Sequence, residues 1–210
     1  MIDFRYLFAK FNIQPIGILH VGANTCQEKD IYEELKVPKV LWIEAIPLVY
    51  EIAKIGLEKY PNQKILNYCI GDEDEKEVEF NLSNNEYQSS SYLEFGVHQT
   101  IHPTVHFIDK VKMKTKRLDT LNKELNLNLE NYDFINFDIQ GAELQALKGM
   151  GELLHNVRYA YLEVNKKETY LGGALVYEID EYLSKFGLIR VETSKYVGES
   201  WADALYCKKI

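Results

Sequence analysis

Three apolar runs of this chain carry a carboxylate at or near their ends. Glu44 follows Val40–Ile43, Asp138 ends the run that begins at Phe134, and Glu163 lies near the end of Tyr159–Val164. If these runs are parallel strands, their carboxyl ends meet at the edge of the sheet where open α/β folds bind ligands. The three carboxylates therefore predict a pocket for a cation or for a ligand rich in hydroxyl groups.

A turn near the N-terminus completes the outline of this pocket. The run Ile16–Val21 is followed by Gly22 and Asn24, of which the first lets backbone approach a ligand and the second supports an unusual backbone angle. Glu44 lies 22 residues after Gly22, close to the separation of about 20 at which an acid meets ribose hydroxyls. Asn24 and Gln27 replace two glycines of a dinucleotide-binding turn, which disfavours a nicotinamide-dependent oxidoreductase.

Other candidate residues have simpler interpretations. Glu143 lies in the first turn of a predicted helix, where the helix dipole favours an acid. His98, His102 and His106 recur every four residues, as zinc ligands on one helix face can, but Pro103 interrupts such a helix. We therefore predict no metal site and interpret the histidines as part of a loop that is solvated or faces the substrate.

The composition is that of one acidic globular domain. The 210 residues include 24 basic and 32 acidic side chains, a net charge of −8, with no basic tract. Nucleic acid and anionic membranes are bound by clustered Lys and Arg, so neither partner is expected. No run approaches the ~18 apolar residues of a membrane span, and no secretory signal is recognisable. The three separated cysteines, Cys26, Cys69 and Cys207, predict free thiols and a cytoplasmic protein.

Apolar runs alternate with helical stretches, which predicts a single domain over residues 1–210 with a mostly parallel sheet. Two segments of period two, Val78–Leu82 and Val111–Lys116, interrupt this order and predict a pair of exposed strands. We expect residues 83–113 to form an inserted loop or ribbon near the active-site edge. The predicted sheet strands are Ile16–Val21, Val40–Ile43, Lys64–Ile70, Phe134–Asp138, Tyr159–Val164, Leu188–Glu192 and Ala204–Cys207, and the predicted helices are Gln27–Leu35, Leu48–Lys59, Ala142–Lys148 and Ala174–Phe186.

Seven short segments follow one another along the chain in a recognisable order: His20–Asn24, Trp42–Ala45, Asn67–Asp72, Ser89–Ser91, Thr115–Leu121, Asp138–Glu143 and Leu147–Gly149. Taken together, they resemble the FkbM family of S-adenosylmethionine-dependent methyltransferases. The resemblance implies a Rossmann-like class I methyltransferase fold, with a mostly parallel seven-stranded sheet, an antiparallel last strand and helices on both faces. It also implies S-adenosyl-L-methionine as the cofactor.

The resemblance assigns a role to each matching position. It implies that Gly22 and Asn24 lie beside the methionine part of the cofactor and that Glu44 takes the ribose hydroxyls. It places Gly71 and Asp72 at the adenine, and Asp138 near the sulfonium and the incoming acceptor. His20 belongs to the same cofactor-binding set.

Three positions depart from the family pattern. His20 occupies a place usually filled by an acid, Cys26 stands where glycine is common, and Gln140 replaces the usual Glu. The change at His20 predicts weaker cofactor binding, and Gln140 cannot ionise. These departures keep a second interpretation open, namely a catalytically inactive binding or scaffold protein that retains the fold.

The leading interpretation is an O-methyltransferase for a small hydroxylated acceptor, such as a glycan sugar or a natural product. Methyl transfer from a sulfonium is an in-line displacement that depends on alignment and on exclusion of water. An alcohol acceptor also loses a proton, for which Asp138 is the first candidate base and Glu163 the second. The neighbouring sulfonium charge lowers the pKa of such a carboxylate and weakens it as a base.

Overall fold

The early apolar strands need cover on both faces, and they form the centre of a seven-stranded sheet. The computed structural model describes residues 2–209, and its main sheet has the order β3-β2-β1-β7-β8-β10-β9. All neighbouring pairs from β3 to β8 are parallel, whereas β10 is antiparallel to both β8 and β9, as predicted. The strands are β1 (Ile18–Val21), β2 (Val40–Glu44), β3 (Gln63–Asn67), β7 (Phe134–Phe137), β8 (Tyr159–Asn165), β9 (Leu188–Thr193) and β10 (Trp201–Lys208).

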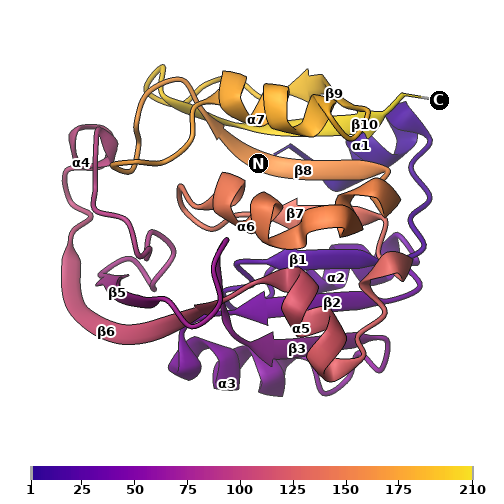
Figure 1. Cartoon of the computed structure of the whole chain (residues 1–210), viewed down its shortest axis with the longest axis horizontal. Helices are drawn as coiled ribbons and strands as arrows, with labels where there is room; N and C mark the ends of the chain where they lie inside the picture. Colours follow the sequence, from indigo (N-terminus) through magenta and orange to yellow (C-terminus); the bar gives the residue numbers. More distant parts are fainter. Residues whose placement is uncertain (1, 210) are drawn as a thin grey trace.

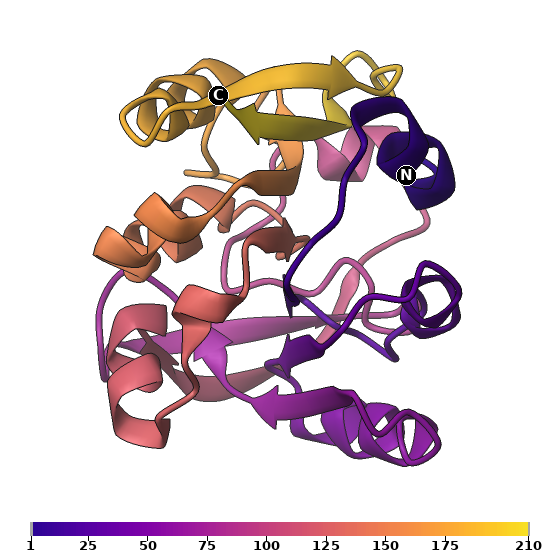
Figure 2. The same cartoon turned by 90° about the vertical axis from the view of Figure 1, so that its right-hand side faces the viewer.

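Helices cover both faces of this sheet (Figure 2). One face is covered by α1 (Phe4–Phe11), α2 (Lys29–Glu34) and α3 (Pro47–Gly56), and the other by α5 (Leu118–Leu125), α6 (Glu143–Met150) and α7 (Val176–Ser184). The short 3₁₀ segments η1 (Leu129–Asn131) and η2 (Gly151–Asn156) lead into β7 and β8. Neither α1 nor α5 is among the helices expected from the sequence; α1 is capped by the Asp3 side chain, which accepts from the Arg5 N–H.

A second sheet lies beyond the carboxyl ends of the parallel strands (Figure 1). It contains β4 (Cys69–Ile70), β5 (Glu77–Ser83) and β6 (Phe107–Lys116) in the order β4-β6-β5, and β5 and β6 pair in antiparallel fashion. The expected single strand Lys64–Ile70 is therefore wrong. It divides at Tyr68, whose N–H donates to the Glu44 carbonyl, so that β3 joins the main sheet and β4 the second sheet.

Two loops are joined to each other above the same edge of the main sheet. The first loop comprises residues 84–106, which include α4 (His98–Ile101), and the second comprises residues 166–175. We call the two together the double loop. Backbone bonds connect them: the N–H groups of Gly96 and Val97 donate to the carbonyls of Thr169 and Glu168, each at 2.9 Å. The double loop therefore carries its own side chains to the carboxyl ends of the strands.

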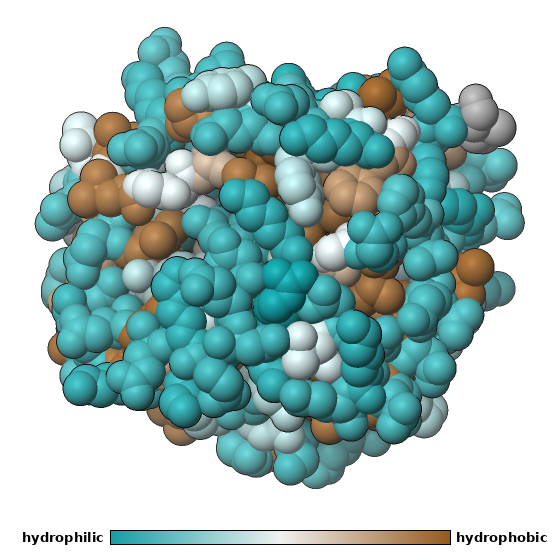
Figure 3. All heavy atoms as spheres, viewed as in Figure 1, coloured by the Kyte–Doolittle hydropathy of each residue, from teal (hydrophilic) through white to brown (hydrophobic). Residues whose placement is uncertain are grey.

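The surface seen in Figure 3 is mainly hydrophilic, with hydrophobic residues in small separate patches. Among residues 2–209, no helix combines the length and the apolar character that crossing a bilayer requires.

Candidate active site

The turn after β1 brings two predicted site residues into contact. Gly22 has φ +87°, and a Cβ added to it would lie 1.8 Å from the Asp138 carbonyl oxygen. Only glycine fits there, because any side chain would collide with the backbone that follows β7. The next residue of the turn with a positive φ is Asn24, at 43°, and its side chain donates to the Glu86 carbonyl of the double loop.

Glu44 is held at the end of β2 by backbone donors on both of its oxygens. Its Oε2 accepts from the Asn24 N–H and its Oε1 from the Ile46 N–H, each at 2.8 Å. The side chain is only 6% exposed, and this burial raises its pKa to about 7, although the backbone donors oppose the shift. Each carboxylate oxygen retains a second lone pair, so Glu44 can still accept hydrogen bonds from a ligand.

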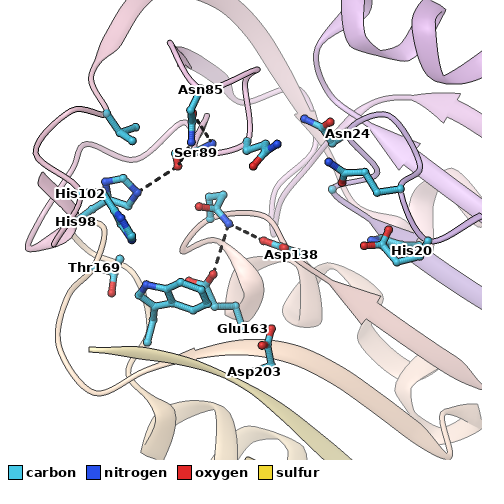
Figure 4. A pocket seen from close by; sticks show the side chains of 17 residues that line it. His20, Asn24, Asn85, Ser89, His98, His102, Asp138, Glu163, Thr169 and Asp203 are labelled. Carbon is cyan, nitrogen blue, oxygen red and sulfur yellow. Dashed lines mark hydrogen bonds between the residues drawn. The ribbon is translucent and has the colours of Figure 1, made fainter. Parts of the chain in front are cut away.

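Three strands supply further carboxylates to one cavity (Figure 4). Asp138 follows β7, Glu163 lies on β8, and Asp203 lies on β10. The Asp138 side chain is open to the cavity. The surrounding protein nevertheless desolvates it and raises its pKa to about 6, and repulsion from Asp203 adds to the shift. Burial, followed by repulsion from Asp138, raises the pKa of Glu163 well above its usual value.

Gln140 connects these acids to the double loop. Its Nε2 donates to Asp138 Oδ1 at 2.5 Å and to Glu163 Oε2 at 3.5 Å, and its Oε1 accepts from the Tyr170 hydroxyl at 2.6 Å. The backbone reaches this position through a positive φ of 55° at Gln140 and 98° at Gly141. A neutral amide thus fills the space between two carboxylates that would otherwise repel each other.

Two more buried acids border the same region. Glu143 accepts from the Ile139 and Gly141 N–H groups, so it caps the turn that leads into α6. Glu28, just before α2, lines the cavity, and burial with repulsion from Asp138 raises its pKa to about 7.

The cavity itself measures about 580 Å³, within the range of small-molecule sites. One half lies against the β1 turn and is lined by Gly22, Asn24 and Glu28, and the other half lies among β8, β10 and the double loop. A smaller, more apolar cavity adjoins the larger one, and the two share Gly22, Asn24, Gln88, Asp138 and Gln140. Glu44 lines the smaller cavity together with Ile43, Ile46, Tyr68, Ile70, Phe80 and Tyr92.

His20 borders the cavity but is tied into the core. Its ring stacks on Trp42 at a centroid distance of 4.4 Å, and its Nδ1 lies 3.2 Å from the Tyr32 hydroxyl and 3.3 Å from Asn136 Nδ2. Burial lowers its pKa to about 3, so the ring is neutral at pH 7. The structure therefore places an uncharged ring where the family pattern has an acid.

Gly71 and Asp72 line neither cavity. The Gly71 N–H donates to the Lys116 carbonyl, and the Asp72 carbonyl accepts from the Arg117 guanidinium. The preceding residue, Ile70, is the one that reaches the smaller cavity.

The three histidines do not share a helix face. α4 ends at Ile101, His98 Nε2 lies 3.2 Å from Ser89 Oγ, and His106 Nδ1 lies 3.3 Å from the Thr104 carbonyl. Within residues 2–209, no three His, Cys, Asp or Glu side chains are grouped in a way that could hold a metal ion.

Sequence reasoning missed two residues of this site, Glu28 and Asp203. Glu28 falls inside the predicted helix Gln27–Leu35, where a polar residue attracts no notice, and Asp203 precedes the expected last strand, which in fact begins at Trp201. Tyr170 is only 1% exposed and reaches Gln140 from a loop. Asp203 interrupts an otherwise apolar run from Trp201 to Cys207, and this was the one signal that could have directed attention to it.

Comparisons with known proteins agree with this geometry. Residues 17–189 match the family described as the methyltransferase FkbM domain. Over 179 residues the chain is 32% identical to 2-O-methyltransferase NoeI of Sinorhizobium fredii (strain NBRC 101917 / NGR234), covering 82% of this chain and 72% of that protein.

Two solved methyltransferases share the fold at low sequence identity. Magnesium protoporphyrin IX methyltransferase from Synechocystis PCC 6803, with bound SAM, has 11% identity and a TM-score of 0.53, covering 98% of this chain and 76% of its own. M. capricolum TrmK, in complex with S-adenosyl-homocysteine, has 11% identity and a TM-score of 0.54, covering 100% of this chain and 70% of its own.

Proposed function

The chain belongs to the FkbM methyltransferase family and uses S-adenosyl-L-methionine, and from this premise we propose that it methylates an oxygen of a small hydroxylated acceptor, such as a sugar or a natural product. The observation that carries the proposal is the pair of joined cavities. The smaller one begins beside Glu44, and the larger one passes Asp138 and ends among polar side chains of the double loop. The smaller cavity measures only about 60 Å³, so an elongated ligand would occupy it together with the adjoining half of the larger cavity beside Gly22 and Asn24. A second, polar ligand in the other half would meet it at Asp138.

The residues present fit the cofactor in their chemistry. Gly22 has no side chain to obstruct a ligand, and Asn24 and Glu44 offer polar atoms beside it. We assign the ribose hydroxyls to Glu44 and the methionine part to Gly22 and Asn24. For the adenine, the apolar side chains of the smaller cavity are better placed than Gly71 and Asp72, which lie behind its wall.

Bound S-adenosyl-L-methionine supplies a methyl group activated by a positively charged sulfur. The protein must align the acceptor oxygen with that methyl group and keep water away from both. The double loop helps to keep water away, because the buried His98 lines the cavity and the buried Tyr170 hydroxyl donates to Gln140, which also lines it.

Asp138 is the residue we assign to the acceptor proton, with Glu163 as the second candidate. Asp138 lines both cavities, so it lies where the two ligands meet. Its raised pKa, about 6, makes it a better base near neutral pH than an ordinary aspartate. Gln140 holds the Asp138 carboxylate by a hydrogen bond to Oδ1, which leaves Oδ2 for the acceptor.

The resemblance to a 2-O-methyltransferase supports an oxygen acceptor. The net charge of −8 and the absence of a basic tract support a small-molecule or glycan acceptor over nucleic acid. Cys26, Cys69 and Cys207 are free thiols, which is in keeping with the cytoplasmic location that we propose.

The test is methyl transfer from isotopically labelled S-adenosyl-L-methionine to a panel of hydroxylated, amino and carboxylic acceptors. Mass spectrometry of the products identifies the labelled atom. Label in an ether linkage supports the proposal, and label found only on nitrogen or in an ester contradicts it.

A further inference from the structure

The half of the cavity that lies beyond Asp138 is separate from the region assigned to the cofactor. It is built from β8, β10 and the double loop. Six of the side chains that line this half of the cavity are Ser89, His98, Glu163, Thr169, Trp201 and Asp203. None of these six lines the smaller cavity.

The charges around this space have one sign. No lysine or arginine is among the 17 described residues that line the cavity, whereas Glu28, Asp138, Glu163 and Asp203 all are. His98 is uncharged at neutral pH, because burial and then the nearby His102 lower its pKa to about 4. An anionic group in this space would therefore face carboxylates with no positive side chain to pair with.

The same space can bind hydroxyl groups. His98 is only 4% exposed, and its Nδ1 has no hydrogen-bond partner among the described residues, although its Nε2 pairs with Ser89 Oγ. The Nδ1 atom is closed off from the cavity, so His98 contributes a neutral ring to the wall of the cavity and no hydrogen bond from Nδ1 to a ligand. The Glu163 carboxylate has a weak bond at 3.5 Å to Gln140 and a hydrogen bond with the Asn165 side chain, and its oxygens retain lone pairs that can accept from a ligand.

One side of this space is aromatic. The Trp201 indole lines it, half-buried, at the start of β10, and the Thr169 hydroxyl on the neighbouring loop is paired with Ser200 Oγ at 2.9 Å. An aromatic face beside carboxylate acceptors suits a ring with one apolar face and hydroxyl groups on its rim, which describes a pyranose.

We propose that Ser89, His98, Glu163, Trp201 and Asp203 form an acceptor subsite for a glycosyl ring that carries no phosphate, sulfate or carboxylate. This inference rests on the proposed function and adds the class and charge of the acceptor. Uncharged and amino-substituted rings fit the subsite, and uronates and sugar phosphates are excluded because the lining offers them no positively charged side chain.

The test compares acceptors that differ only in charge. Methyl transfer is measured to glycosides of glucose, glucosamine, glucuronate and glucose 6-phosphate, and to the corresponding galactose set. We expect kcat/KM for the two anionic members to be about 100-fold lower than for the uncharged member. Preference for an anionic member, or no transfer to any member, overturns the inference.

A variant series links the charge preference to the subsite. Asp203→Asn is expected to narrow the discrimination against glucuronate by about tenfold, whereas the control Asp109→Asn, on the exposed part of β6, leaves the ratio unchanged. The ratio compares acceptors within one protein sample, so a partly unfolded variant does not distort it. An unchanged ratio in Asp203→Asn overturns the assignment of Asp203.

Binding of S-adenosylhomocysteine distinguishes a failure of the acceptor subsite from a failure of the proposed function. If this product binds and no glycoside is methylated, the acceptor subsite is wrong while the cofactor site stands. If it does not bind at all, the proposed function itself fails.

Discussion

Glu163 on β8 and Asp203 on β10 lie directly opposite each other in the antiparallel ladder, and both side chains line one cavity. Like charges in directly opposed positions destabilise a sheet. The protein nevertheless places them beside Asp138, where burial and mutual repulsion raise the pKa of Glu163 and of Asp138. Costly arrangements of this kind are concentrated at functional sites, which agrees with the assignment of this cavity to catalysis.

The buried acids give the stability of the cofactor-free protein a defined dependence on pH. For Glu28 the folded-state pKa is raised from 4.5 to about 7, first by burial and then by Asp138. The folded state therefore binds the proton more tightly than the unfolded state, and stability is lost as the pH rises from 4.5 through 7. We expect Glu28→Gln to be more stable than wild type by about 2 kcal/mol at pH 8, with no such gain at pH 4.5.

Urea unfolding at the two pH values measures this difference. Glu77→Gln, an exposed position on β5, is the matched control and should change stability equally little at both. A Glu28→Gln effect of the same size at pH 4.5 and pH 8 would contradict the raised pKa.

Gln140 should be sensitive to the introduction of charge. Its amide donates to Asp138 and Glu163, and Gln140→Glu replaces those donors with a third carboxylate. At pH 5 the new carboxyl group can share a proton with Asp138 or Glu163, but at pH 8 the ionised carboxylates repel one another. We expect the variant to lose about 1–3 kcal/mol more stability at pH 8 than at pH 5.

Thermal unfolding across this pH range provides the measurement. Gln140→Met removes the same hydrogen bonds without adding charge, so its loss of stability should be similar at both pH values. If Gln140→Glu and Gln140→Met show the same pH profile, the amide does not separate the two acids as described.

Asp138 should control turnover more than cofactor binding. Replacement by Asn removes the proton acceptor, and general-base catalysis typically contributes about 10²–10⁴ in rate. We expect kcat of Asp138→Asn to fall by about 100-fold or more. In the wild type, kcat should fall about tenfold for each unit of pH below the pKa of Asp138. This pKa is about 6 in the cofactor-free protein, and the bound sulfonium charge lowers it.

The measurement is kcat between pH 5 and 9 with a glycoside that the wild type methylates. Wild type, Asp138→Asn and Glu163→Gln are measured in parallel. Intact turnover in Asp138→Asn would remove the assignment. Loss confined to Glu163→Gln would transfer the role to Glu163.

The cofactor side of the site is largely predictable from sequence, and the acceptor side is not. Gly22, Asn24, Glu44 and Asp138 are tied to the ends of short apolar strands, so a local pattern places them at one sheet edge, where the structure brings them together. His20 is also at such a strand, yet its packing against Trp42 depends on a neighbouring strand and has no local signature.

The acceptor side could not be predicted because several of its residues lie on loops. Ser89, His98 and Tyr170 come from loops joined by backbone bonds between segments about 70 residues apart, and such pairing leaves no periodicity in the sequence. The division of Lys64–Ile70 into β3 and β4 was likewise hidden, because an apolar run does not reveal which of two sheets it joins.

The most direct test of the cofactor site is calorimetric titration of the purified protein with S-adenosylhomocysteine, alongside Glu44→Ala and the exposed control Glu58→Ala. Wild type and Glu58→Ala should bind with a Kd on the order of 1–10 μM, and Glu44→Ala should lose about 10-fold to 100-fold in affinity because the buried acceptor of the ribose hydroxyls is gone. Equal affinity in Glu44→Ala would contradict the placement of the ribose. No binding by the folded wild type would contradict the methyltransferase site and favour a scaffold that retains only the fold.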